Sequence, residues 1–427
     1  MLDARSSQPG RRLDWTDFIL RRLTDPLGFA GLAVPESLPH GRDHLIALRL
    51  KGRPFAVNIL FCWTDISGYM AACWRALAAR EGVAVTVLAS GPGAAAAFDA
   101  SLMHGLHWIR LSRGDRTDAA AIQSHVGRLD PNLDPDVIVI AGWLSPAYRR
   151  MAYRVAAGAR TRLILAMDTP WRGTVRQQVA RLVLRRYCGQ FDAAWVPGER
   201  GWEYARRLGF PGDRILRGVY GFDWKGASRA GEIRKRAGVV PRRFLFIGRY
   251  IPEKGVDLLL DGYARYREAV ADPWDLACCG QGPLANLLTG RPGVIDRGFR
   301  QPDQLVAEIA AAGALVAPSR YDPWNVAIME AAAGGLPILC SHACGVSAEV
   351  VREGTTGHAF EANSVEAVTH AMLQAHHAPH LHALGSAARE AVRPYAADAW
   401  ADGLLAFVNN LPGRREYTAD RTGFRNN

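Results

Sequence analysis

Two carboxylates eight positions apart, Asp322 and Glu330, flank the segment of the chain whose residue types best fit a chemical site. The segment follows a short apolar run (314–317) and opens a run of small residues (327–334) that is typical of a helix. Asp322 therefore falls in a loop, and Glu330 falls within the helix. The first turn of such a helix carries backbone N–H groups that have no partner inside the helix. Here these groups belong to Asn325, Val326 and Ala327.

The backbone amides determine what this segment could bind. Unpaired N–H donors and the positive end of the helix dipole point the same way, which favours a diphosphate group. Glu330 lies about one turn further along the same face, where it could accept hydrogen bonds from a ribose beside the phosphates. Asp322, on the loop, could reach the group on the far side of the diphosphate. A site that holds a diphosphate, a ribose and a hydroxyl-rich sugar is a nucleotide-sugar site.

The same segment resembles the acidic-x7-Glu signature of the family-4 retaining glycosyltransferases. Further motifs that resemble this family's landmarks follow one another in the expected order, at 244–255, 280–283, 333–338 and 353–357. The resemblance is strong from about Phe244 to Phe360, is thinner over the first half of the chain and is absent before about Pro54. It implies the GT-B fold, in which two doubly wound Rossmann-like α/β domains face each other across a cleft.

Alternating strand and helix signals predict a doubly wound α/β architecture from the residues themselves. Apolar runs predict strands at 55–61, 83–88, 137–140, 163–166, 193–196, 244–247, 276–279, 294–295, 315–317 and 337–339. We predict an extension over 1–53, an acceptor domain over 54–222 and a nucleotide-sugar-binding domain over 223–395. A helix over 396–412 should cross back to the first domain, as the resemblance implies, and residues 413–427 should form a disordered tail.

Two cations, Arg249 and Lys254, follow the strand predicted at 244–247. They would lie at the carboxyl end of the strand, where open α/β sheets bind ligands, and Gly248 would let the backbone turn tightly there. Cations beside a diphosphate would balance the charge that grows on the leaving group, and the resemblance assigns this work to both positions. Taken alone, they could be surface cations after a turn. The Asp322–Glu330 segment downstream favours the binding role.

Three glycines complete the predicted donor site. The resemblance places Gly280 and Gly282 near the nucleotide base. In the first domain, the loop after the first strand is where the family carries a glycine-rich turn. Only Gly68 is a glycine in this loop, which puts the loop's approach to the phosphates in doubt.

Asp168 is the clearest departure from the family, because many relatives have a histidine at this place. A carboxylate here could accept a hydrogen bond from a hydroxyl of the donor sugar or acceptor, or act as a base. The alternative is a cap for a helix that starts near Pro170. Trp143 and Trp171 also lie on loops after strands. Either could stack on a sugar ring, but we expect both to be packed in the interior.

The resemblance also implies a mechanism, with retention of configuration at the anomeric carbon. In the usual proposal the leaving phosphate oxygen takes the acceptor's proton, so that the protein supplies positioning and electrostatics. We expect no cofactor and no catalytic metal. The acidic pair at 134–136 encloses a proline and fits a turn, and the histidines at 376, 377, 380 and 382 fit solvated side chains.

Composition agrees with a soluble enzyme of at least two domains. The chain has 427 residues, of which 49% are hydrophobic and 22% are charged. We find no apolar run of transmembrane length and no signal-peptide core at the N-terminus. The seven cysteines form no metal-binding pattern and are expected to be small buried thiols, which fits a reducing cytoplasm.

The formal net charge of +11 comes with arginines that are dense between Arg149 and Arg217. The run 172–186 reads as a basic amphipathic helix, and two interpretations stay open. It could contact an anionic membrane surface, as in related glycosyltransferases with lipid-linked acceptors, or it could cover the sheet with its arginines in water. No sequence signature of nucleic-acid binding is visible, so we expect no nucleic acid partner.

The sequence therefore predicts a retaining glycosyltransferase that moves a sugar from a nucleotide sugar to a hydroxyl of a glycan or lipid-linked acceptor. Polysaccharide, glycolipid or other glycoconjugate biosynthesis would be its setting. Its expected location is the cytoplasm, on the inner face of the membrane if the basic helix binds lipid. The alternative is a non-catalytic protein that kept the fold for binding or scaffolding, which Asp168 and the glycine-poor first loop leave open.

Overall fold

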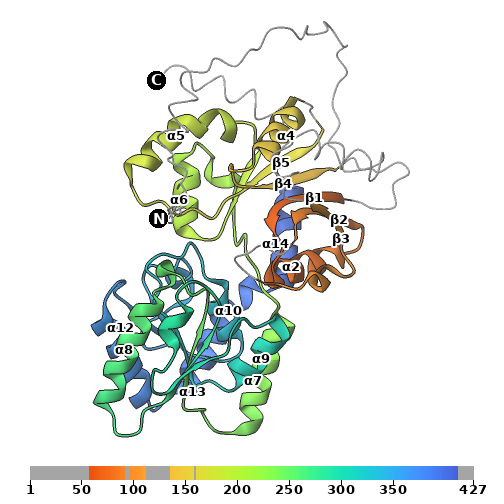
Figure 1. The fold of residues 1–427 in the computed structure, drawn as a ribbon. Coiled ribbons are helices and arrows are strands. Elements are labelled where there is room, and N and C mark those ends of the chain that lie inside the picture. Colours follow the sequence, from red (N-terminus) through yellow and green to blue (C-terminus); the bar gives the residue numbers. More distant parts are fainter. Residues whose placement is uncertain (1–56, 92–96, 112–134, 158–159, 412–427) are drawn as a thin grey trace, which may run out of the picture. The chain divides into compact units, whose positions relative to one another are not determined.

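The computed structural model describes residues 57–91, 97–111, 135–157 and 160–411 (Figure 1). All of them belong to one compact unit of the chain, Leu50–Asn427. The predicted extension (1–53) and tail (413–427) lie outside the described residues. The two α/β halves are described in turn below.

The first half is built on a sheet whose described strands are all parallel, in the order β3-β2-β1-β4-β5-β6-β7. These strands are β1 (Val57–Asp65), β2 (Val83–Ser90), β3 (His107–Leu111), β4 (Val137–Ala141), β5 (Arg162–Ala166), β6 (Ala193–Val196) and β7 (Ile215–Arg217). The chain builds the sheet outward from β1 to β3, then returns to β4 beside β1 and continues to β7. The order of the strands therefore reverses between β1 and β4, and such switch points are where open α/β sheets bind ligands.

The second half repeats this plan, with parallel strands in the order β10-β9-β8-β11-β12-β13. The strands are β8 (Arg243–Ile247), β9 (Asp275–Cys279), β10 (Val294–Asp296), β11 (Ala314–Ala317), β12 (Ile338–Ser341) and β13 (Gly357–Phe360). Here the strand order reverses between β8 and β11. The doubly wound α/β class predicted from the sequence is confirmed in both halves.

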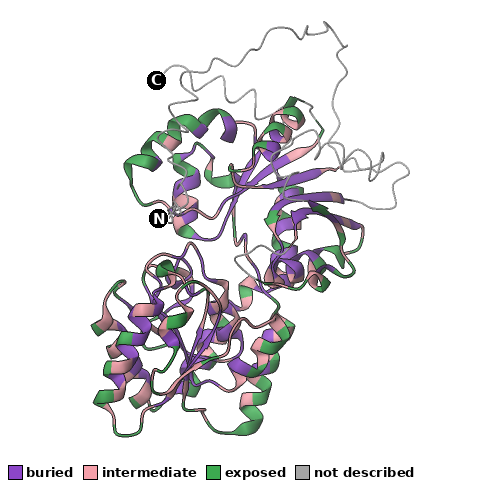
Figure 2. Ribbon diagram, viewed as in Figure 1, coloured by how far each residue is buried: buried purple, intermediate pink, exposed green. Residues whose placement is uncertain are grey.

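Helices connect the strands and cover the sheets. In the first half they are α2 (Gly68–Ala78), η1 (Ala100–Met103), α4 (Pro146–Ala157), α5 (Val175–Cys188), α6 (Glu199–Arg207) and η2 (Gly212–Arg214). In the second half they are α7 (Trp224–Ala237), η3 (Pro252–Lys254), α8 (Val256–Ala269), η4 (Ala285–Leu288), α9 (Pro302–Ala310), α10 (Val326–Ala333), α11 (Ser347–Val350), α12 (Val365–His377), α13 (Leu381–Val392) and η5 (Arg393–Tyr395). Central strands and the inner faces of helices are buried in both halves, as Figure 2 shows.

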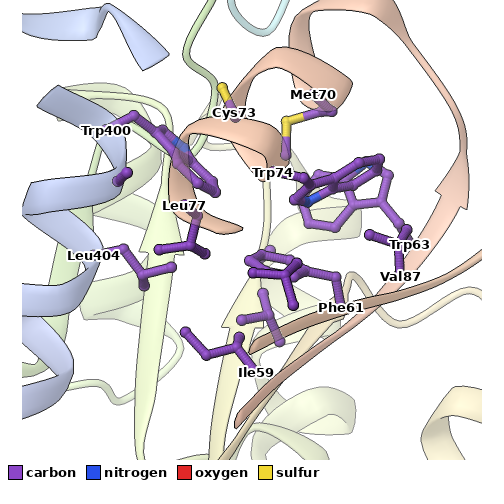
Figure 3. Packing of buried hydrophobic residues seen from close by; sticks show 14 of the residues in the cluster. Ile59, Phe61, Trp63, Met70, Cys73, Trp74, Leu77, Val87, Trp400 and Leu404 are labelled. Atoms are coloured by element: carbon purple, nitrogen blue, oxygen red, sulfur yellow. The ribbon is translucent and has the colours of Figure 1, made fainter. Parts of the chain in front are cut away.

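The last described helix, α14 (Ala397–Asn410), belongs to the core of the first half although it follows the second. It packs on α2, and Trp400 stacks on Trp195 with ring centroids 4.9 Å apart. The Trp400 indole N–H donates to the Val219 carbonyl oxygen at 3.0 Å. Figure 3 shows Trp400 and Leu404 among the buried side chains of this cluster. The chain thus returns to its first sheet before the described residues end.

All seven cysteines are free and buried, which confirms the expectation of small interior thiols. None of the described helices combines the length and apolar character that would let it cross a membrane.

Candidate functional site

The start of α10 presents three consecutive backbone N–H groups. Asn325 precedes the helix with φ 76°, a left-handed conformation that few residue types other than glycine and asparagine adopt. The first backbone N–H group that makes a hydrogen bond within this turn is that of Ile328, which donates to the Asn325 carbonyl oxygen at 3.2 Å. Within the described part of the chain, no hydrogen bond is recorded for the N–H groups of Asn325, Val326 or Ala327. The predicted row of donors is therefore present, and it begins at the carboxyl end of β11, beside the switch point.

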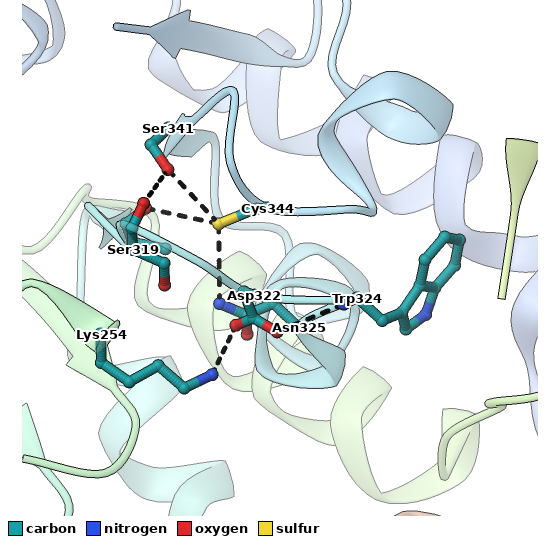
Figure 4. A network of polar contacts seen from close by, with 8 residues as sticks. Lys254, Ser319, Asp322, Trp324, Asn325, Ser341 and Cys344 are labelled. Atoms are coloured by element: carbon teal, nitrogen blue, oxygen red, sulfur yellow. Dashed lines mark hydrogen bonds and ion pairs between the residues drawn. The ribbon is translucent and has the colours of Figure 1, made fainter. Parts of the chain in front are cut away.

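A network of buried polar groups holds this loop in place (Figure 4). The Asn325 amide Nδ2 lies 3.9 Å from Cys344 Sγ, and that sulfur lies 3.6 Å from the Ala317 carbonyl oxygen. The Gly345 N–H donates to the Asp322 carbonyl oxygen at 2.9 Å. Ser341 Oγ donates to the Ser319 carbonyl oxygen at 2.5 Å. Residues that follow β12 thus fix the loop that follows β11, which pre-organises the N–H donors.

Lys254 and Asp322 form an ion pair at the switch point of the second sheet. Lys254 Nζ lies 2.5 Å from Asp322 Oδ2, and the two side chains are only 17% and 6% exposed. The other carboxylate oxygen of Asp322 accepts the Trp324 N–H at 3.2 Å. Sequence reasoning selected both residues but did not predict their contact. The pair places the cation beside the free amides and keeps the buried carboxylate neutralised.

Arg249 is the second cation predicted after β8, and its side chain is exposed. Among the described residues, no side-chain hydrogen bond or ion pair is recorded for it. It therefore differs from Lys254, which is already held in place. An unpaired guanidinium of this kind is available to a ligand that brings its own negative charge.

Glu330 lies on α10 one turn after the free amides, as predicted, and it is half-buried. Burial raises the pKa of its carboxyl group to about 7, with a smaller contribution from the nearby charge of Asp223. In the described residues no hydrogen bond or ion pair is recorded for the carboxylate. It is thus a partly desolvated acceptor without a protein donor, as a ribose-binding carboxylate would be before its ligand arrives.

Gly280 and Gly282 have a packing role that the sequence did not reveal. A Cβ atom at Gly280 would lie 1.9 Å from the Gly248 carbonyl oxygen, and one at Gly282 would lie 2.4 Å from the Tyr250 carbonyl oxygen. The loops after β8 and β9 therefore touch backbone to backbone, and Gly248 donates its N–H to the Cys279 carbonyl oxygen at 3.0 Å. The glycines fix the shape of the loop that carries Arg249.

Gly68 is the first residue of α2, which follows β1, and Ser67 caps the helix by accepting the Met70 N–H at 3.4 Å. A Cβ atom at Gly68 would lie 2.5 Å from Pro302 Cγ. The glycine thus allows close approach to α9. This close packing explains why a glycine stands at position 68, whereas contact of Gly68 with a phosphate stays a prediction.

Asp168 follows β5 in the first half and accepts a hydrogen bond from the Tyr220 hydroxyl at 3.0 Å. Burial is the largest influence on its carboxyl group and raises the pKa, while the Tyr220 bond opposes the rise and Asp322 adds to it. The alternative of a helix cap is wrong. The next helix, α5, begins only at Val175 and is capped by Thr174, whose Oγ1 accepts the Gln177 N–H at 3.3 Å.

Two tyrosines near Asp168 were missed by sequence reasoning. The rings of Tyr69 and Tyr220 meet edge to face with centroids 5.8 Å apart. The pKa of Tyr69 is raised to about 12, mainly by burial and to a smaller extent by the charges of Asp168, Glu330 and Asp322. Tyr69 and Tyr220 also pack against the hydrophobic core of the second half, so residues of both halves gather here. In the sequence, Tyr220 was notable only for its position two residues before the predicted end of the acceptor domain at 222.

The remaining predictions from the sequence have different outcomes. Trp143 and Trp171 pack around Tyr204, with centroid distances of 6.3 and 5.6 Å, but both are only partly buried, so interior packing is confirmed in part. His376 is not merely solvated: its Nδ1 lies 2.7 Å from the Tyr266 hydroxyl, because the helix α12 turns it toward α8. Across the described ranges no group of three or more His, Cys, Asp or Glu side chains could hold a metal ion. Metal independence stays a prediction.

Comparison with known proteins agrees with this geometry. Residues 241–377 match the family "Glycosyl transferases group 1". The sulfoquinovosyl transferase of Arabidopsis thaliana is 31% identical over 158 residues, which cover 35% of this chain and 30% of that protein. The alpha-D-kanosaminyltransferase of Streptomyces kanamyceticus is 29% identical over 168 residues, with 36% and 43% covered. The matched part thus spans less than half the length of these curated relatives.

Solved structures show the same fold at low identity. The sucrose-phosphate synthase of Thermosynechococcus elongatus has a TM-score of 0.65 and 18% identity, with 85% of this chain and 100% of that chain covered. The Anabaena protein HepE in complex with UDP and glucose has a TM-score of 0.62 and 17% identity, with 83% and 100% covered. These neighbours are glycosyltransferases of the GT-B fold. The chain therefore has the GT-B fold, and its residues 241–377 are similar to the group 1 glycosyltransferases.

Proposed function

We propose that the protein is a retaining glycosyltransferase that moves a sugar from a nucleotide sugar to a hydroxyl group of its acceptor. The observation that carries this proposal is the combination at the second switch point. There the Lys254–Asp322 ion pair ties a cation to the loop that leads into three backbone N–H groups with no recorded partner. Solved relatives support the donor class, because HepE is described in complex with UDP and with UDP-glucose.

The diphosphate of the donor would lie against the amides of Asn325, Val326 and Ala327. Lys254 and Arg249 would then balance the charge that develops as the sugar–phosphate bond breaks. In front-face attack, the anomeric carbon loses its bond to the phosphate oxygen and gains one to the acceptor oxygen. The acceptor's proton passes to the leaving phosphate oxygen, so atoms and charge balance without a protein nucleophile. A cofactor or catalytic metal is not needed for this scheme.

The carboxylates have distinct positions in this scheme. Glu330 would accept the ribose hydroxyls, since it is one turn beyond the amides and has no recorded protein donor. Asp322 would orient a hydroxyl of the donor sugar once the diphosphate draws Lys254 toward itself. Asp168, held by Tyr220, would orient or deprotonate a hydroxyl of the sugar or the acceptor from the side of the first sheet.

We further propose a glycan or lipid-linked acceptor in polysaccharide or glycolipid assembly, with a peripheral location on a membrane. The names of the sulfoquinovosyl and kanosaminyl transferases show that relatives of this C-terminal half transfer different sugars. As part of the same proposal, we assign the protein to the family-4 enzymes, because its sequence contains the acidic-x7-Glu segment.

A panel of nucleotide sugars tests the proposed activity. Thermal shifts and diphosphate release would be measured with UDP-, GDP-, ADP- and dTDP-sugars on wild type, on Glu330→Ala and on the exposed control Glu361→Ala. We expect one nucleotide class to stabilise wild type and the control but not Glu330→Ala, with slow release of that diphosphate. Stabilisation without any release would favour a non-catalytic binding protein. No shift with any donor would refute the donor site itself.

A further inference from the structure

The helix α5 carries apolar side chains on its outer face as well as on its inner face. Its inner face packs into the first half of the protein through Leu184, Tyr187 and Cys188, which are all buried. On the outer face, Val175 is 80%, Leu182 69% and Val183 51% exposed. The side chains of the inner face already complete the packing of α5 against the core. The apolar side chains of the outer face, called the outer stripe below, therefore have no packing role in the described residues.

This outer stripe is concentrated at one place. Seven large hydrophobic residues are exposed in the described ranges, by 37% to 80%, and four of them lie on α5. They are Val175, Val179, Leu182 and Val183, at the spacing of one helical face. Leu144, which precedes α4, is 69% exposed as well. Scattered exposed aliphatic residues need no explanation, but a stripe along one helix indicates a partner.

The surface around the stripe is strongly basic. From Val137 to Phe191 the sequence contains ten arginines and a single acidic residue, Asp168. The arginines with exposed side chains on α4 and α5 are Arg150, Arg154, Arg176, Arg181, Arg185 and Arg186. Two cation–π contacts join these helices, because Arg149 lies 5.7 Å from the Tyr187 ring and Arg186 lies 6.0 Å from the Tyr153 ring. The helices α4 and α5 thus present one continuous basic and apolar surface.

We infer that this α4–α5 surface binds an anionic lipid bilayer. A bilayer accepts both features at once, because the aliphatic side chains enter the headgroup boundary while the long arginine side chains reach the lipid phosphates. Nucleic acid would use the arginines but leave the aliphatic stripe in water. A second copy of the chain, related by a two-fold axis, would set the same basic surface against itself.

The surface is also connected to the first-half side of the candidate site. The loop 168–174 leads from Asp168 to α5, and Gln177 of α5 holds that loop. Its Nε2 donates to the Pro170 carbonyl oxygen at 2.7 Å, and its Oε1 accepts the Arg172 N–H at 2.8 Å. The binding surface and the loop that carries Asp168 are therefore parts of one connected segment. The inference rests on the proposed function only for the idea that the acceptor is lipid-linked.

Vesicle co-sedimentation of the full chain tests the inference without donor or acceptor. The vesicles would contain phosphatidylcholine alone, or equal parts of phosphatidylcholine and phosphatidylglycerol, at low and high salt. The variants would be Leu182→Ser with Val183→Ser, and Arg181→Gln with Arg185→Gln. A matched control on α7 would combine Ile233→Ser with Lys235→Gln and Arg236→Gln, because these residues are also exposed and basic or apolar.

We expect binding only to the anionic vesicles, weakened by salt. Each arginine removed should lower the partition coefficient about five-fold, so the double arginine variant loses about 25-fold. The serine variant should lose at least about ten-fold, and the α7 control should bind like wild type. Unchanged melting temperatures would show that the variants fold.

Other outcomes overturn the inference. Equal binding to both vesicle types, or equal losses in the α7 control, would show that this surface is not the contact. A wild-type dimer that the serine variant dissociates would assign the stripe to a second copy. Failure of donor turnover with intact vesicle binding would reject the proposed function and leave this surface standing.

Discussion

At the scale of single residues, the Lys254–Asp322 ion pair should affect both stability and catalysis. The two effects can be measured separately. The Lys254→Met variant should lose the charge that stabilises the leaving diphosphate and should leave the buried Asp322 without its cation. We expect diphosphate release to fall about 100-fold and the free energy of unfolding to fall by about 3 kcal/mol or more. Donor turnover and urea denaturation measure the two effects.

A second substitution in the same pair provides the control. In Lys254→Met with Asp322→Asn the buried charge is gone, and the Asn oxygen can still accept the Trp324 N–H. Most of the lost stability should return while activity stays low. If activity returned together with stability, Lys254 would have only a structural role.

Asp168 and Tyr220 give a prediction in pH. The Tyr220 hydroxyl donates to the carboxylate, which favours its ionised form and opposes the rise in pKa that burial causes. Removing this donor in Tyr220→Phe should raise the pKa of Asp168 further. The acid limb of the pH–rate profile should therefore move to higher pH, by an amount that pH-dependent turnover measures. In Asp168→Asn that limb should disappear, and its persistence would assign it to another group.

Glu330 should make nucleotide binding depend on pH near neutrality. Its pKa is raised to about 7, and only the ionised carboxylate accepts both ribose hydroxyls. Affinity for the nucleoside diphosphate, measured by calorimetry, should rise between about pH 6 and pH 8. The Glu330→Gln variant should bind more weakly and without this dependence. A dependence that survives in Glu330→Gln would have to come from the phosphate or another side chain.

The raised pKa has a second consequence for the protein without ligand. The folded state holds the proton on Glu330 more tightly than the unfolded chain does. The stabilising contribution is therefore complete below the unfolded pKa and is lost as the pH rises through about 7. The unfolding free energy of wild type should fall over this window relative to Glu330→Gln, as denaturation at several pH values would show. A constant difference would mean that the environment of Glu330 is more polar than the structure indicates.

At the scale of elements, the sequence predicted the central strands and the edge strand β10, and it missed the other three edge strands. The predicted runs at 244–247 and 276–279 correspond to β8 and β9, which are continuous apolar segments buried on both faces. The missed strands β3, β7 and β13 lie at or next to sheet edges, where half of the residues are exposed or only partly buried. An edge strand needs no continuous apolar run, so its signal is weak in a single sequence.

The candidate site shows the same division. The N–H donors of α10 could be predicted because they follow from where a helix begins. The Lys254–Asp322 contact and the Tyr220–Asp168 bond could not, because each joins residues 68 or 52 positions apart whose meeting depends on strand order. The kinds of functional group at the site could therefore be predicted from the sequence. Which side chains contact each other could be known only from the fold.

The glycine loops after β8 and β9 give a prediction for an element. A Cβ atom at Gly280 would overlap the Gly248 carbonyl oxygen, so Gly280→Ala must displace the loop that carries Arg249. We expect a loss of about 3 kcal/mol in unfolding free energy and weaker donor binding. Gly403→Ala is the control, since nothing lies within 4 Å of its added Cβ and it sits within α14. That variant should gain about 0.5–1 kcal/mol, and equal losses in both would contradict the steric argument.

At the scale of the whole molecule, the excess of positive charge is unevenly placed. The formal charge of +11 is the difference between 52 basic and 41 acidic residues. The segment from Val137 to Phe191 alone contributes +9, from ten arginines and one aspartate. A charge distribution of this kind favours one orientation of the molecule toward an anionic surface. It does not bear on the donor site, which lies in the second half, where Lys254 is paired with Asp322.

The return of α14 to the first sheet makes the ends of the described chain depend on each other. Leu404 is fully buried against residues of β1 and α2, although more than 300 positions separate them. The Leu404→Ala variant leaves a cavity in the core of the first half. We therefore expect the free energy of unfolding to fall by about 2–5 kcal/mol. Leu182→Ala, at an exposed position of α5, should change it by less than about 0.5 kcal/mol.

Hydrogen exchange would locate the loss caused by Leu404→Ala. Amides of β1 and α2 should exchange faster in that variant, whereas those of β8 and β9 should keep their protection, because Leu404 contacts only the first core. Faster exchange confined to α14 would mean that the helix detaches without loosening the sheet. In that case the first half would be stable without its C-terminal helix, and the packing of Trp400 on Trp195 would contribute little to the fold.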